Sequence, residues 1–351
     1  ETMAYTTIND PSEYFNTVLY SGTGANGNAV IGNGFQPDWV WAKSRSNTGH
    51  DHHAWDSSRG TGGKDIYPNE NFGEGSDADR FSAFGSDGFT VGGSGHVNTH
   101  PDSYVAWSWK ANGGTTTAGA GNDTIATSTH QASTTSGFSI VTYTGEEANK
   151  TVKHGLSTAL DMLLVKNRNS TKDWRMWFKG FSGTQRLELN NNEARATTST
   201  SWNGTVPGSS VFSLGDDTNT NTDGDTFVAY CFHSVQGYSK FGSYTGNGNA
   251  DGTFVYTGFK PAWIMIKQTD GTGSWAIHDT KRGTINPIDE DLFANLSSAE
   301  SDNDIEKDIL SNGFKLRASH SAVNGNGNSY IYMAFAESPF VTSNGGPNNA
   351  R

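Results

Sequence analysis

The sequence predicts an all-β fold built from tandem antiparallel β-sandwich repeats of the jelly-roll or concanavalin-like type. Three markers keep one register along the chain, and each of them occurs three times. They are a lysine-ended strand (DWVWAK at 38–43, DMLLVK at 161–166, AWIMIK at 262–267), an aromatic strand (SYVAWSW at 103–109, TFVAYCF at 226–232, SYIYMAF at 329–335) and a phenylalanine (Phe89, Phe212, Phe314). The steps are 123 residues and then 101 to 103 residues, which indicates three copies of one structural unit.

The composition is that of a β protein with many turns. Aromatic residues make up 12% of the 351 residues, Gly occurs 43 times, and charged residues are only 17%. Aromatic and β-branched runs that end at Gly, Asn or Asp are typical of antiparallel strands joined by tight turns. The net charge of −12 argues against a nucleic-acid partner, which requires a basic surface. Because no apolar run is long enough to cross a bilayer, we expect no membrane insertion.

The markers and the low-complexity stretches divide the chain into six parts. We expect the three repeats at 17–112, 137–235 and 236–340. The Gly/Ser/Thr-rich residues 113–136 form a connector, which accounts for the longer first step. The ends are predicted to be an N-terminal docking segment and an extended C-terminal tail, at 1–16 and 341–351.

The lysine-ended strand is apolar on both of its faces. In its first copy Trp39, Trp41 and Lys43 share one face, because alternate residues of a strand point the same way. We therefore expect a central strand of a two-sheet sandwich, with the tryptophans of the repeated strands in the core. The one cysteine, Cys231, stands where the other copies have a small residue, so we expect a buried structural thiol.

Two copies carry the same Asp-x-x-Arg-Gly element, in HAWDSSRG (53–60) and SWAIHDTKRG (274–283). An acidic start, a charge-assisted Asp–Arg bond and a terminal Gly suit a tight turn. The functional alternative is a carboxylate–guanidinium ligand site, formed by Asp56, Arg59, Asp279 and Arg282. The middle copy has WFKGF (177–181) instead, so the fold does not require the element. The turn clamp is the favoured interpretation.

Two stretches have the composition of a metal site. The acidic stretch DDTNTNTDGD (216–225) has hard oxygen ligands that suit Ca²⁺, although its spacing is not that of an EF-hand. The histidine stretch HDHH (50–53) offers imidazole ligands, although adjacent residues of an extended chain point to opposite sides. The candidate ligands are Asp216, Asp217, Asp223, Asp225, His50 and His52. In both stretches a polar turn is the favoured interpretation, with bound Ca²⁺ or another divalent metal as the alternative.

Catalysis has no support in the sequence. It contains no GxSxG nucleophile elbow and no Walker-type loop, and its acidic residues are scattered over loops. We therefore expect no enzymatic activity, no catalytic residue and no required cofactor. Trp202, in the loop TSWNGTVPG, is the candidate for stacking on a sugar ring, with core packing as the alternative.

Long phrases of the chain resemble a known family. They are YTTINDPSEYF, PDWVWAKSR, SDGFTVG with SYVAWSWKANG, GFSIVTYTG, the run from VFSLGDD to AWIMIK (211–267), and LSNGFKLR with YIYMAFAESPFVTS. These phrases resemble repeat-bearing virion proteins of marine tailed bacteriophages. The resemblance covers nearly the whole chain. It implies lectin-like β-sandwich repeats, a place on the phage particle and no catalytic residue.

The resemblance and the repeats together predict a non-enzymatic virion structural protein, in a tail fibre, spike or capsid decoration. Its surface loops are expected to contact a host glycan or other virion proteins. Such assemblies are symmetric, so we expect a homo-oligomer, with a trimer as the first choice. Two alternatives stay open. One is a carbohydrate-active depolymerase on a jelly-roll scaffold, which needs two carboxylates in one cleft, and the other is a bacterial surface filament protein.

Overall fold

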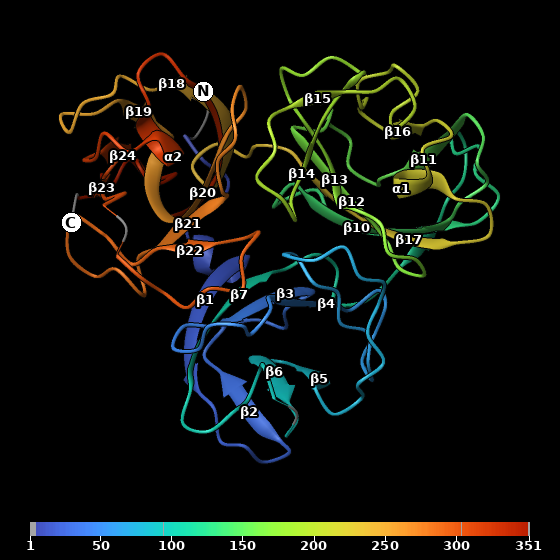
Figure 1. Cartoon of the computed structure of the whole chain (residues 1–351), viewed down its shortest axis with the longest axis horizontal. Helices are drawn as coiled ribbons and strands as arrows, with labels where there is room; N and C mark the ends of the chain where they lie inside the picture. The colour runs from blue at the N-terminus through green and yellow to red at the C-terminus, as the bar shows by residue number, and fades with distance from the viewer. Residues whose placement is uncertain (1–4, 94, 303, 350–351) are drawn as a thin grey trace.

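In the computed structural model, residues 5–93, 95–302 and 304–349 are described. The protein is all-β, and its antiparallel sheets gather into three lobes (Figure 1). We call residues 15–109 lobe 1, residues 117–232 lobe 2 and residues 239–339 lobe 3. Helices within the described ranges are single turns: η1 (Pro11–Glu13), α1 (Thr218–Asn221) and α2 (Ser321–Asn324). None of them has the length or the apolar sequence needed to cross a membrane.

Lobe 1 contains two antiparallel sheets. The larger has the strand order β1-β7-β3-β4 and the smaller has the order β2-β6-β5. The strands are β1 (Phe15–Ser21), β2 (Asn28–Ile31), β3 (Trp39–Ser44), β4 (His53–Asp56), β5 (Phe81–Gly85), β6 (Gly88–Val91) and β7 (Ser103–Trp109).

Lobe 2 has the longest sheet, with the order β15-β14-β13-β12-β17-β10-β9-β8, and a two-stranded sheet β11-β16. Its strands are β8 (Thr117–Ala118), β9 (Ser128–Ser133), β10 (Phe138–Thr144), β11 (Lys150–Lys153), β12 (Met162–Asn167), β13 (Arg175–Phe178), β14 (Gln185–Glu188), β15 (Ala196–Thr197), β16 (Val211–Leu214) and β17 (Thr226–Phe232). Both β8 and β9 come from the predicted connector, which therefore extends the sheet of lobe 2.

Lobe 3 again has a larger and a smaller sheet, with the orders β18-β25-β20-β21-β22 and β19-β24-β23. Its strands are β18 (Ser239–Thr245), β19 (Phe254–Tyr256), β20 (Phe259–Gln268), β21 (Ala276–Asp279), β22 (Leu292–Phe293), β23 (Lys307–Leu310), β24 (Gly313–Leu316) and β25 (Ser329–Pro339).

Four strands have the same order in every lobe. Across the larger sheets these orders are β1-β7-β3-β4, β10-β17-β12-β13 and β18-β25-β20-β21. In each case the first of these four strands pairs with the last strand of the lobe, which pairs with the lysine-ended strand. The lysine-ended strand thus has a hydrogen-bonded neighbour on both sides, which confirms its predicted central position.

The larger sheets of the three lobes share one aromatic core. Trp39 of lobe 1 stacks on Tyr230 of lobe 2, with ring centroids 4.3 Å apart. Phe335 of lobe 3 lies 5.0 Å from Phe15 of lobe 1 and 6.0 Å from Phe232 of lobe 2. All 10 tryptophans are buried, as is the Cys231 thiol, whose pKa burial raises. Burying a side chain of Phe size contributes roughly 1.5–3 kcal/mol, so this core holds the lobes together.

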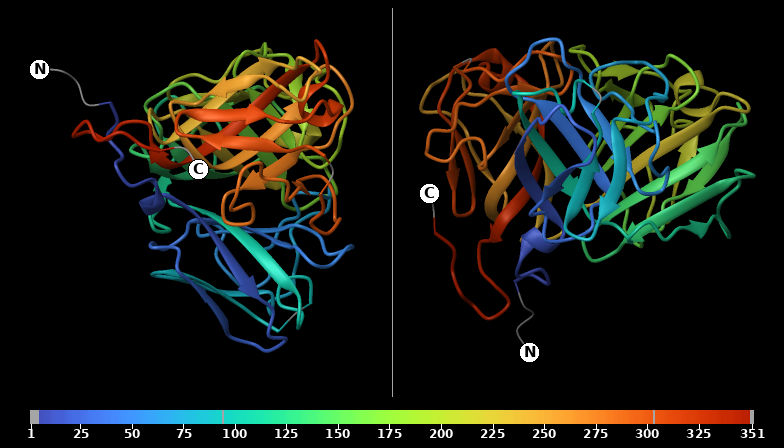
Figure 2. Two further views of the ribbon diagram at one scale, coloured as in Figure 1. Left: turned by 90° about the vertical axis from the view of Figure 1, so that its left-hand side faces the viewer. Right: turned by 90° about the horizontal axis from the view of Figure 1, so that it is seen from below.

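Residues 5–9 lie beside residues 340–343 at one end of the molecule (Figure 2). Asn9 and Ser343 exchange two hydrogen bonds of 2.8 Å, and the ring of Tyr5 lies 6.5 Å from that of Phe340. The Tyr5 hydroxyl donates to the Gly258 carbonyl at 2.7 Å. The described start of the predicted docking segment, residues 5–9, therefore packs on lobe 3 and the stretch that follows it, although the segment leads into lobe 1; residues 1–4 lie outside the described residues.

Candidate functional site

Backbone hydrogen bonds join the lobes in a closed ring. At each junction, a loop of one lobe donates to a carbonyl that follows the lysine-ended strand of the next lobe. The three bonds are Glu74 N to Arg168 O (2.7 Å), Arg195 N to Thr269 O (2.8 Å) and Glu300 N to Arg45 O (2.8 Å). They run from lobe 1 to lobe 2, from lobe 2 to lobe 3 and from lobe 3 back to lobe 1. Each lobe is therefore held by both of its neighbours.

The three marker lysines are buried beside these junctions. The Lys166 ammonium donates to the carbonyls of Lys172, at 2.9 Å, and of Asn71 in lobe 1, at 3.3 Å. Burial lowers the pKa of Lys166 to about 7, and lowers the pKa of both Lys43 and Lys267 to about 8. Since backbone carbonyls enclose the Lys166 amine, its role is to tie lobe 2 to lobe 1.

The Asp-x-x-Arg elements lie inside two of the junctions. The Arg59 Nε donates to Asp56 Oδ2 at 2.5 Å, and both side chains are fully buried. The same Asp56 oxygen accepts from the Tyr230 hydroxyl of lobe 2 at 2.7 Å. In lobe 3, Asp279 Oδ2 accepts from Arg282 Nε at 2.6 Å and from the Trp107 indole N–H of lobe 1 at 3.0 Å. The four candidate ligand residues are thus paired within the chain, which favours the turn clamp.

The third junction, between lobes 2 and 3, is apolar at the matching place. The register of β12 with β13 puts Phe178 where the other lobes have the clamp aspartate. In lobe 3, Met333 occupies the position that Tyr230 has in lobe 2. Phe178 and Met333 line one small apolar cavity of about 10 Å³. At this matching place, therefore, two junctions have a charged hydrogen bond and the third has apolar packing.

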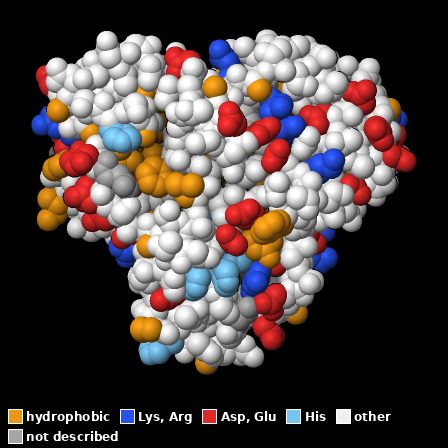
Figure 3. Space-filling model, in the orientation of Figure 1, with side chains coloured by type: hydrophobic (Ala, Val, Ile, Leu, Met, Phe, Trp, Pro, Cys, Tyr) orange, Lys and Arg blue, Asp and Glu red, His pale blue; other side chains and the backbone are white. Residues whose placement is uncertain are grey.

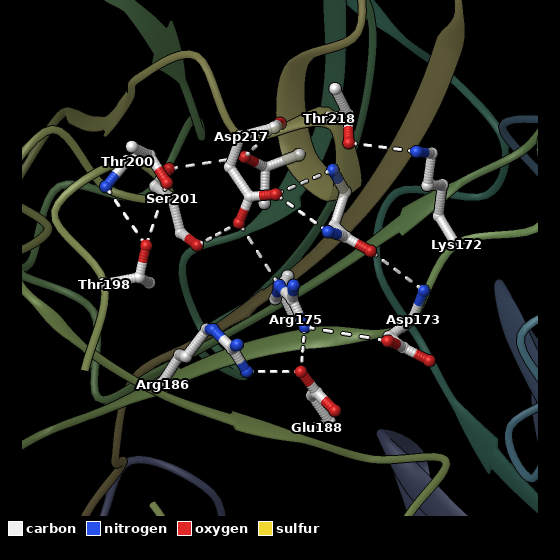
Figure 4. Close-up of polar contacts among 12 residues, drawn as sticks. Lys172, Asp173, Arg175, Arg186, Glu188, Thr198, Thr200, Ser201, Asp217 and Thr218 are labelled. Carbon is white, nitrogen blue, oxygen red and sulfur yellow. Dashed lines mark hydrogen bonds and ion pairs between the residues drawn. The ribbon is translucent and has the colours of Figure 1, made fainter. Parts of the chain in front are cut away.

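The structure does not gather the four candidate Ca²⁺ ligands of the acidic stretch. Asp216 and Asp223 are exposed. Asp217 caps α1 and accepts from the Ser201 hydroxyl and from Arg175 Nε, the latter at 3.2 Å (Figure 4). Asp225 accepts from Asn167, the last residue of β12, and from Ser170 in the loop that follows. The turn interpretation of this stretch agrees with these contacts.

Figure 4 shows the wider network around Arg175 of β13. Its guanidinium is bonded to Glu188 of β14 as well as to Asp217, and Glu188 also accepts from Arg186. Hydrogen bonds to Ser201 and Asn219, together with the Arg175 charge, outweigh burial and lower the pKa of Asp217. The network joins β13 and β14 to the loop before α1, which makes it a brace within lobe 2.

The two candidate histidine ligands also have partners. His52 is buried, its Nδ1 accepts from the Trp41 indole at 2.8 Å, and its Nε2 lies 3.0 Å from the Phe293 carbonyl of lobe 3. His50 stacks on His96, with ring centroids 4.6 Å apart. Within residues 5–93, 95–302 and 304–349, no group of three or more His, Cys, Asp or Glu side chains is placed to hold a metal ion.

Trp202, the candidate sugar contact, is fully buried, and its indole N–H donates to the Gln185 carbonyl at 3.2 Å.

The exposed aromatic side chains lie elsewhere. Phe254 and Tyr256 alternate with a buried valine on β19, and 44% and 47% of their surfaces are accessible. Sequence reasoning missed this pair. The available signal was FVY between two turn-forming stretches, in which alternation puts both aromatic rings on one face.

The β19 pair faces outward from the smaller sheet of lobe 3. The Lys240 amine lies 5.1 Å from the Tyr256 ring centroid, and the Tyr5 hydroxyl lies 3.3 Å from that of Tyr256. Phe254 pairs in register with Lys315 of β24. Two aromatic faces with amine and hydroxyl groups beside them are suited to contact with a sugar, whose rings have both apolar faces and hydroxyls.

The matching positions of the other lobes lack aromatic rings. In each lobe a valine pairs with the marker phenylalanine, and the residues on either side of that valine correspond to one another. Phe254 and Tyr256 therefore correspond to Ala29 and Ile31 in lobe 1, and to Thr151 and Lys153 in lobe 2. The β19 pair is thus specific to lobe 3.

The face of the molecule shown in Figure 3 is mostly uncharged and polar, with charged and hydrophobic side chains in small groups.

Residues 10–339 match the family described as a domain of unknown function, DUF7483. The chain belongs to this family. No curated protein and no solved structure gives a significant match. The DUF7483 match spans the described sheets of all three lobes, so these lobes together form the family's domain.

Proposed function

We propose that this DUF7483 chain is a non-enzymatic structural protein of a bacteriophage particle, in a fibre, spike or capsid decoration. In this proposal the lobes are three copies of one β-sandwich of the jelly-roll or concanavalin-like type. The closed ring of junctions is the observation that carries it, because a ring makes a rigid body from three small sandwiches. The shared strand order and the sequence resemblance support it as well.

The ring has a consequence for assembly. Each lobe buries its larger sheet against the other two, so one chain already supplies a three-fold arrangement of sandwiches (Figure 1). The homotrimer expected from the sequence stays a prediction, and native mass spectrometry of the purified chain measures it. Contact with other virion proteins would use the outer surfaces of the lobes, since the inner ones are occupied.

The placement is tested on particles. Phage particles purified by density gradient should contain the chain at a fixed copy number, and gold-labelled antibodies should mark it on the virion in electron micrographs. Recovery of the chain only from the soluble fraction of lysed cells would contradict the placement.

Within this proposal, we assign contact with a host surface glycan to Phe254 and Tyr256. Their exposed rings and the nearby Lys240 amine support the assignment. An array of bacterial surface polysaccharides should bind the chain, and the double variant Phe254→Ala with Tyr256→Ala should lose about tenfold or more in affinity, since each stacking contact contributes on the order of 1 kcal/mol.

The matched control is Ile31→Ala, at the position that corresponds to Tyr256 in lobe 1, which should bind like the wild type. Equal binding by all variants would contradict the assignment. Release of reducing ends from a bound polysaccharide would instead favour a depolymerase.

A further inference from the structure

Lobe 2 shows how the first of the four shared strands can be covered, which in that lobe is β10. There β9, the strand STHQAS, pairs antiparallel with the outer side of β10. Ile140 is opposite Gln131, and Thr142 is opposite Thr129, with their hydroxyl oxygens 2.9 Å apart. The covering strand carries no Asp, Glu, Lys or Arg. This chain thus contains an example of strand addition at this edge.

In lobe 1 the corresponding strand, β1, is at the end of its sheet and has β7 on one side alone. Its sequence FNTVLYS resembles the β10 sequence FSIVTYT, with Phe, Val and Tyr at matching register positions. A strand with a neighbour on both sides should be more buried than an edge strand. Accordingly, β10 is mostly buried, whereas Leu19 and Ser21 of β1 are exposed. Figure 1 shows β1 at the left side of lobe 1.

Backbone bonds at the two ends of β1 show which residues face outward. Gly22 N donates to Asp102 O and Lys110 N donates to Tyr14 O, so the even-numbered residues face β7. The N–H and C=O of Leu19 therefore face away from the sheet. Among the described residues, Leu19 has no hydrogen-bond partner on that side.

The edge of lobe 3 differs in its charge. On β18 the outward N–H of Phe241 is bonded to the Ser234 hydroxyl at 3.2 Å, just as the outward N–H of Thr17 on β1 is bonded to Asn16 Oδ1 at 2.9 Å, but β18 also carries Lys240. A lysine on an edge strand discourages the pairing of another strand, and β1 has no charged residue. A cleft of about 320 Å³, lined by Asn16, Thr17 and residues of lobe 3, continues from the start of β1. The accessible edge is therefore that of β1.

We propose that β1 is a docking site for an extended segment of a partner protein, which adds as an antiparallel strand beside it. The segment is uncharged and rich in Ser and Thr, like β9, because β9 occupies the corresponding edge of a strand of similar sequence. Opposite Leu19 it carries a β-branched apolar residue, where β9 has Thr129. This inference does not depend on the proposed place on a virion.

The test uses the full chain and a capped synthetic peptide of residues 126–134 in which the residue corresponding to Thr129 is Val. Binding should slow hydrogen exchange at the Leu19 and Ser21 amides by about tenfold or more at saturation, because an amide in a ladder is protected. A control peptide with Pro at the positions of Thr129 and Gln131 lacks the two donors that face β1 and should give no protection.

Two protein variants complete the test. Leu19→Pro removes the outward donor of β1 and should abolish binding of the Val peptide, whereas Ser243→Pro, at the corresponding position of β18, should leave it unchanged. Because Leu19→Pro can also unfold β1, Leu19→Lys serves as a second variant, and far-ultraviolet circular dichroism checks each fold. Protection that appears on β10 or β18 instead of β1 would overturn the proposal. So would protection of Leu19 without peptide in a self-associated chain.

Discussion

Tyr230→Phe tests the idea that single charged hydrogen bonds lock the lobes together. The variant removes one hydroxyl from the junction of lobes 1 and 2, and leaves the ring stacked on Trp39. A hydrogen bond to a charged group contributes about 1.5–3 kcal/mol. Asp56 keeps its bond to Arg59 in the variant, so its carboxylate stays paired. We therefore expect a loss near the lower end of that range, about 1.5–2 kcal/mol.

The assay is urea unfolding at pH 7, followed by tryptophan fluorescence. Asp56→Asn should cost more, about 3–5 kcal/mol, because it leaves the buried Arg59 guanidinium short of a counter-charge. In the Asp56→Asn background, Tyr230→Phe should cost less than about 0.5 kcal/mol, since the charged acceptor is already gone. The matched control is Met333→Leu, at the same place in the apolar junction, which should change the unfolding free energy by less than about 1.5 kcal/mol. Additive losses in the double variant would refute the reasoning.

Two further predictions concern stability. Burial lowers the pKa of His154 to about 4, and the Nδ1 of its neutral ring accepts from the Leu156 N–H. Between pH 6.5 and pH 4 this histidine is therefore protonated in the unfolded chain but neutral in the folded one, so the unfolded chain binds more protons. The unfolding free energy should therefore fall as the pH drops through that window, and less so for His154→Gln in the same titration. Gly92→Ala would put a methyl carbon 1.7 Å from the Asp79 carbonyl oxygen, so we expect a loss of at least about 2 kcal/mol in urea unfolding, and an unchanged midpoint would contradict the geometry.

The regular features of the fold were predictable from local pattern. Alternation and the both-faced apolar strands predicted antiparallel β structure, because residue type and strand geometry are linked through side-chain direction. The lysine-ended strand was predicted to be central, and Lys43, Lys166 and Lys267 are buried at matching places. The connector was harder to interpret, because STHQAS has little apolar content and becomes a strand through its pairing with β10.

The candidate sites were less predictable, because composition does not show what faces what. Asp217 has the chemistry of a cation ligand, and its neighbour in space turns out to be Arg175 of a different strand. Trp202 lies in a loop sequence and is nevertheless buried. Phe254 and Tyr256 are exposed because alternation along β19 turns both rings away from the buried Val255.

The amino-acid sequence by itself determined the antiparallel β class and the positions of the marker strands, since these follow from side-chain size and alternation along one chain. The tertiary structure alone decided how the lobes close into a ring, which residues fill the junctions, and which edge strand is left accessible. Those outcomes depend on contacts between residues more than 90 positions apart, such as Tyr230 with Asp56 and Arg168 with Glu74. No local pattern encodes such contacts, because their free energy arises only when the separate lobes meet.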